Sequence, residues 1–71
     1  MGERLLEHAL ERLVTLKSSY SRIANFGVHE NGSGWVHIKG IPDLHLTADE
    51  LMVYTDSELL EKVTKHDKRF Q

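Results

Sequence analysis

The sequence predicts a single α+β domain over residues 1–71: a long N-terminal helix, an antiparallel β-hairpin with an optional third strand, and a C-terminal helix. Three observations predict this class. Apolar residues near the N-terminus recur with the period of an α-helix, two β-prone runs flank Asn31-Gly32, and two capping-box patterns lie in the last third of the chain.

The N-terminal segment contains no glycine or proline from Glu3 to Phe26, and we expect a helix over residues 3–24. On a helical wheel its apolar residues lie on one side and cover an arc of roughly 180°, wider than the roughly 100° that one core requires. These residues are Leu5, Leu6, Ala9, Leu10, Leu13, Val14, Leu16, Tyr20, Ile23 and Ala24. Such a helix needs two neighbours.

A second copy of the chain is one source of that second neighbour. Positions 6, 9, 13, 16, 20 and 23 repeat with the alternating spacing of three and four that suits a helix pair. The predicted dimer interface consists of Leu6, Leu13, Leu16, Tyr20 and Ile23. In the alternative, the rest of the chain covers the whole arc.

Asn31-Gly32-Ser33-Gly34 separates two strands, residues 26–30 and 35–39. If Asn31-Gly32 alone is the turn, Val28 faces Trp35; if all four residues form the loop, Glu30 faces Trp35. Directly opposed residues share a face. Both registers therefore place Phe26, Val28, Trp35, His37 and Lys39 on one face, and Gly27, His29, Val36 and Ile38 on the other.

Both faces are partly apolar, so one should cover the N-terminal helix and the other should bind a partner. If Val36 and Ile38 point to the core, Trp35, His37 and Lys39 project outward and become candidate contact residues for a protein. An aromatic residue beside a cation also suits single-stranded nucleic acid. In the third interpretation, Trp35 belongs to the core or to a dimer interface.

Leu44-His45-Leu46 alternates like a short third strand. Thr47 and Thr55 each precede a glutamate by three residues, which is the capping-box pattern. We expect a short helix over Ala48–Tyr54, with a strand as the alternative, and a final helix after Thr55. The apolar stripe of that helix contains Leu59, Leu60, Val63, His66 and Phe70.

Charge is uneven in this last third. Residues 47–61 carry five acids and no base, namely Asp49, Glu50, Asp56, Glu58 and Glu61, whereas residues 62–71 carry four bases against Asp67. An acidic block of this kind can dock a basic partner, and we predict Asp49, Glu50 and Tyr54 as further contact residues. The alternative is a solvated pair of helix starts, where acids are favoured.

Composition excludes several classes of function. A net charge of −2 with 39% hydrophobic residues is unlike a disordered chain or a dedicated DNA-binding module. There is no cysteine, and the five histidines lack metal-ligand spacing, so we expect no metal, cofactor or catalytic residues. No stretch has the length of a signal peptide or a membrane span.

Together these patterns predict a small cytoplasmic protein-binding module, homodimeric through its N-terminal helix, that acts as a regulator, adaptor or inhibitor of a partner protein. The alternative is an accessory domain that binds nucleic acid with the aromatic and basic face of the hairpin.

Overall fold

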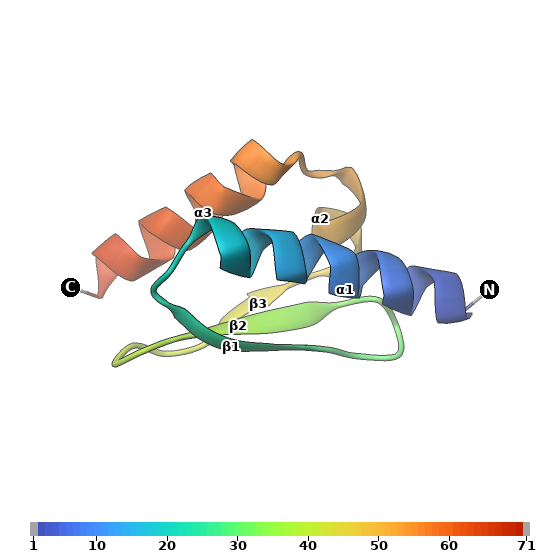
Figure 1. The fold of residues 1–71 in the computed structure, drawn as a ribbon, viewed down its shortest axis with the longest axis horizontal. Coiled ribbons are helices and arrows are strands. Elements are labelled where there is room, and N and C mark those ends of the chain that lie inside the picture. Colours follow the sequence, from blue (N-terminus) through green and yellow to red (C-terminus); the bar gives the residue numbers. More distant parts are fainter. Residues whose placement is uncertain (1, 71) are drawn as a thin grey trace.

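The computed structural model describes residues 2–70, with side chains from Leu6 to Phe70. Over these residues the elements are α1 (Gly2–Ser19), β1 (Ile23–Val28), β2 (Gly34–Ile38), β3 (Leu44–Leu46), α2 (Ala48–Val53) and α3 (Asp56–Arg69). The strands form one antiparallel sheet in the order β1-β2-β3, and all the helices lie on one side of it (Figure 1). The predicted α+β class and the third strand are confirmed.

The core lies between the sheet and the helices. Buried residues of α1, the strands, α2 and α3 form one cluster: Ala9, Leu13, Leu16, Ile23, Val36, Ile38, Leu46, Leu51, Leu59 and Val63. α1 contacts β1, β2, α2 and α3, so its wide apolar arc meets the sheet on one flank and the other helices on the other. The chain itself thus covers most of the arc, while Leu10 and Val14 at one flank remain exposed.

The predicted helix is too long at its C-terminal end. α1 stops at Ser19, where the last helical bond runs from the Tyr20 N–H to the Leu16 carbonyl, and the chain then turns into β1. Ser18 and Ser19 are weak helix formers. Ile23 gains more as a buried strand residue opposite Ile38 than as a further helical turn. Ile23 and Ala24 are therefore strand residues, and the repeat of three and four residues that is predicted to pair two helices ends before position 23.

The hairpin adopts neither predicted register. His29 donates its N–H to the Ser33 carbonyl (2.8 Å) and accepts from the Gly32 N–H (3.0 Å), so the loop consists of Glu30, Asn31 and Gly32. Gly32 has φ +88°, a left-handed conformation that favours glycine and closes three-residue hairpin loops. Asn31 Oδ1 reinforces the loop by accepting from the backbone N–H and the hydroxyl of Ser33.

This register pairs Phe26 with Val36 and Gly27 with Trp35. A shift of one residue exchanges the faces of one strand relative to the other. The predicted grouping of Phe26 and Val28 with Trp35 is therefore wrong: Phe26 and Val28 share the core-facing side with Val36.

Both capping boxes are confirmed. Residues 48–53 form the predicted short helix rather than a strand, and Tyr54 is its C-cap. Thr47 and Thr55 each accept from the backbone N–H of the glutamate three residues on, and each glutamate accepts from the backbone N–H of its threonine. The capping residues satisfy donors at each helix start that would otherwise lack partners.

A buried carboxylate ties α3 to the connection between α1 and β1. Asp67 is fully buried; it accepts from the Tyr20 hydroxyl at 2.5 Å and from Arg22 Nε and Nη2 at 2.6 and 3.0 Å. Because a buried charge is costly unless it is paired, these bonds fix α3 against the connection between α1 and β1.

We expect Asp67→Asn to lower the free energy of unfolding by about 2 to 3 kcal/mol, because the charge-assisted bonds to Tyr20 and Arg22 are lost. Urea denaturation followed by the fluorescence of Trp35 measures it. Asp43→Asn is the matched control, since Asp43 pairs with His37 where both side chains are more than 40% exposed. That control should change stability by only a few tenths of a kcal/mol. Equal losses in the two variants would contradict the role of Asp67.

The Tyr20 hydroxyl should also make stability depend on pH. Donation to Asp67, then burial, raises the pKa of Tyr20 above its ordinary 10.0. A raised folded pKa stabilises the protein below the unfolded pKa, and this contribution disappears as pH rises through the folded value. The urea midpoint of the native protein should therefore fall more steeply above pH 10 than that of Tyr20→Phe. Parallel curves for the two proteins would rule out this linkage.

Candidate interaction surface

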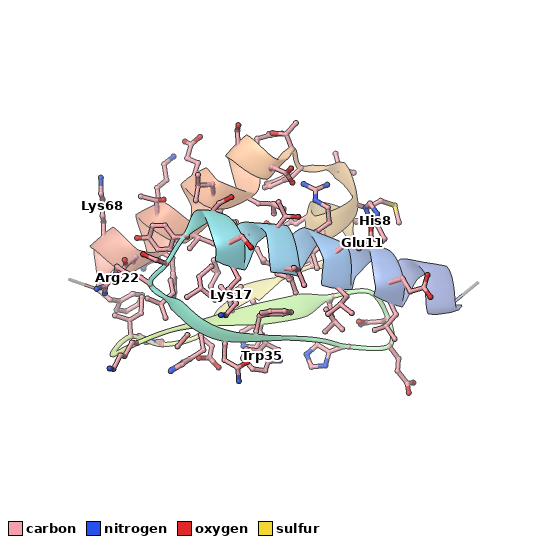
Figure 2. The ribbon with its side chains drawn as sticks, in the orientation of Figure 1. His8, Glu11, Lys17, Arg22, Trp35 and Lys68 are labelled. Carbon is pink, nitrogen blue, oxygen red and sulfur yellow. The ribbon has the colours of Figure 1, made fainter. Side chains whose placement is uncertain are left out.

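The side of the sheet that faces away from the helices is uncovered within the described chain, and Trp35 lies there (Figure 2). In the observed register Gly27 and His45 oppose Trp35 on the two outer strands, and Asn25 opposes His37. We call the side chains of Asn25, Trp35, His37 and His45 the open face. Lys39 is exposed in the turn directly after β2.

Trp35 lies across its own sheet. A Cβ on Gly27 would stand 2.6 Å from the Cε2, Cζ2 and Nε1 atoms of the indole, so the ring occupies the space above this glycine. An aromatic ring that covers a glycine on the neighbouring strand stabilises the pair. Trp35 is consequently only partly buried, on the centre strand, and presents part of its surface outward.

The residues around the indole are polar and rich in hydrogen-bond donors. His37 Nδ1 lies 2.7 Å from Asp43 Oδ1, and this contact orients the imidazole ring. His37 is about half exposed, and His45 and Lys39 are exposed. This surface therefore has one aromatic centre with imidazole groups beside it on β2 and β3, the ammonium group of Lys39 beyond the end of β2, and the carboxylate of Asp43 already paired.

The histidines are grouped differently from the sequence prediction. Both predicted registers place His29 and His37 on opposite faces of the sheet. In the observed register, the alternation of side chains along the two strands places them on the same face. His29 and His45 line one shallow hollow of about 400 Å³ beside the hairpin loop, with Ser33 and Thr47. Among residues whose side chains are described, no three His, Asp or Glu residues come together in a way that could hold a metal ion.

The six predicted contact residues lie on two different sides of the molecule. Trp35 and His37 belong to the open face and Lys39 follows them in the turn after β2, whereas α2, which carries Asp49 and Glu50 and ends at the C-cap Tyr54, lies on the helical side of the sheet (Figure 1). The structure adds Asn25 and His45 to the first group. A glycine inside a strand, Gly27, was the signal in the sequence for the close approach of Trp35.

The acidic block is largely paired within the chain. Glu50 caps α2 and forms an ion pair with Lys62, and Asp56 pairs with Arg12 at 3.2 Å. The same arginine also donates to the Tyr54 carbonyl. Glu58 caps α3 and Glu61 pairs with Lys65 at 2.9 Å, while Asp49 is exposed at the start of α2. Glu50 therefore connects α2 to α3, and Asp56 connects α3 to α1.

The predicted dimer residues are mostly enclosed by their own chain. Leu13, Leu16 and Ile23 are at most 2% exposed, and Leu6 and Tyr20 are partly buried. Large apolar side chains that are exposed include Leu10 and Val14 on α1 and Met52 and Val53 on α2. Any contact between copies therefore has to use residues other than the three buried ones.

Comparison with protein-family models, with curated proteins and with solved structures found no match to this chain. Among the described residues, no helix is long and apolar enough to cross a membrane.

Proposed function

We propose that the protein is a small protein-binding module whose contact surface is the open face of the sheet, extended at its margin by Lys39. The observation that carries this proposal is the position of Trp35, which is only partly buried at the centre of a sheet face that no helix covers. Large aromatic residues surrounded by polar groups are typical centres of protein interfaces, because they bury much area with little loss of side-chain freedom.

The charges around Trp35 indicate the chemistry of the partner. Lys39 carries a positive charge, the exposed imidazole of His45 offers polar ring nitrogens, and the carboxylate of Asp43 is already hydrogen-bonded to His37. We therefore infer a partner that presents an apolar side chain to the indole, with carboxylates around it. Complementary charge of this kind steers association and selects the partner.

Single-stranded nucleic acid is the competing ligand, since bases also stack on an exposed indole. The net charge of −2, and a single lysine beside the open face, make this ligand less favourable than a protein.

A module of this size acts by occupying the surface of its partner, as a regulator, adaptor or inhibitor does. We place it in the cytoplasm, a reducing compartment compatible with a chain that lacks cysteine.

Substitution at Trp35 tests the proposal. We expect a protein retained from native-cell lysate by the immobilised wild-type chain to be lost with Trp35→Ala. Once that protein is purified, its affinity for Trp35→Ala should be at least about tenfold weaker than for wild type, because a central aromatic contact contributes about 2 kcal/mol. Lys39→Glu should weaken binding less, and mainly at low salt.

Phe70→Ala is the matched control, since Phe70 is also an exposed aromatic residue (46%) but lies at the end of α3. It should retain the partner. If Trp35→Ala and Phe70→Ala behave alike, the open face is not the binding surface. If instead a single-stranded oligonucleotide binds, with an affinity that falls steeply with salt and disappears in Trp35→Ala, the nucleic-acid function replaces the proposed one.

A further inference from the structure

α1 has an exposed apolar strip that the rest of the described chain leaves uncovered. Leu10 and Val14 are 44% and 48% exposed, although both lie on a helix that packs against the sheet. They are four residues apart, so they stand one turn apart on the same side of the helix. Glu7 and Lys17 continue this line at spacings of three residues in each direction.

These four residues, Glu7, Leu10, Val14 and Lys17, form what we call the α1 seam. Their spacing of three, four and three is the spacing by which two helices pack along a common line. Glu7 and Lys17 are exposed, and neither belongs to an ion pair among the described side chains. The seam thus has an apolar middle, an unpaired acid at one end and an unpaired base at the other.

This order of charges is complementary to itself. When two copies of α1 lie antiparallel about a two-fold axis near Arg12, Leu10 of one copy faces Val14 of the second copy. The same axis places Glu7 opposite Lys17 of the second copy, and Lys17 opposite its Glu7. An interface with two-fold symmetry requires such a pattern, because the same surface must match its own rotated image.

The neighbouring strand edge does not offer an equally good contact. β1 is an outer strand, but its register shifts between Ile23 and Asn25, and Asn25 Oδ1 accepts from the Phe26 N–H at 2.9 Å. Bulges and side chains that occupy edge donors prevent pairing with another strand. A second copy is therefore better accommodated by the helix than by extension of the sheet at β1.

We propose that a second copy of this chain packs antiparallel on the α1 seam and forms a two-fold dimer. This interface uses none of the residues of the open face: Glu7, Leu10, Val14 and Lys17 all belong to α1, whereas the open face belongs to the strands. Dimer formation is therefore independent of the proposed function, and each copy keeps its open face. Two half-exposed apolar residues per chain make a small interface, so the dimer is weak and in rapid exchange with monomer.

Exchange of the two charges tests this arrangement. In Glu7→Lys two lysines oppose each other at both ends of the interface, and in Lys17→Glu two glutamates do. We expect each single variant to dissociate at least about tenfold more readily than wild type, because two attractive pairs become repulsive. The double variant Glu7→Lys/Lys17→Glu restores both pairs and should dimerise within about threefold of wild type.

Sedimentation velocity from about 10 µM to 1 mM at low salt measures these constants, and circular dichroism checks that each variant folds. Glu30→Lys is the matched control: it makes the same change of charge at an exposed site in the hairpin loop, and should leave the dimer unchanged. Trp35→Ala should also dimerise normally. A wild-type monomer at 1 mM, a double variant no better than the single ones, or an equal loss in Glu30→Lys would each overturn the proposal.

Discussion

The alternation of side chains along β2 divides the molecule into a covered side and an open side. Val36 and Ile38 are buried under the helices, while Trp35 and His37 point the opposite way. A three-stranded sheet with α1, α2 and α3 on one side can bury only one of its faces. The second face therefore either remains in contact with water or is covered by another molecule, and the proposed function follows from this constraint.

The connections between distant parts of the chain depend on charged groups as well as on the core. Asp67 holds the end of α3 to Tyr20 and Arg22, and Arg12 on α1 meets Asp56 at the start of α3. These contacts enclose the flank of α1 that bears Leu16, whereas the flank that bears Leu10 and Val14 receives no such cover. The helix is therefore divided between a face used for folding and a face available to a second copy.

Patterns that depend on local chemistry predicted the structure well. The threonine–glutamate pairs at Thr47 and Thr55 predicted both helix starts, because the capping residues act within one turn. Asn31-Gly32 likewise located the hairpin. The loop length was predicted wrongly: the observed loop of Glu30, Asn31 and Gly32 is one residue longer than the Asn31-Gly32 turn and one shorter than the four-residue loop, and it places Phe26 and Val28 on the covered side.

The same limit applies to the candidate sites. Trp35, His37 and Lys39 could be grouped from the alternation of a single strand, but Asn25 and His45 join them only through pairing between strands. The apolar arc of α1 predicts Leu13 and Leu16 at a contact between copies, whereas the structure buries both within the chain, because a helical wheel does not show which flank the rest of the chain will cover. Only the packing of α2 and α3 identifies Leu10 and Val14 as the exposed pair.

The most direct measurement of the open face is quenching of Trp35 fluorescence, since Trp35 is the one tryptophan in the sequence. The structure predicts substantial quenching by small solutes in the native monomer. It also predicts that iodide quenches more efficiently than caesium, because the ammonium group of Lys39 follows at the end of the strand that carries Trp35 and the carboxylate of Asp43 is already hydrogen-bonded to His37. Protection of Trp35 from both ions, as for an indole enclosed in a core, would show that this face is covered and would contradict the central claim.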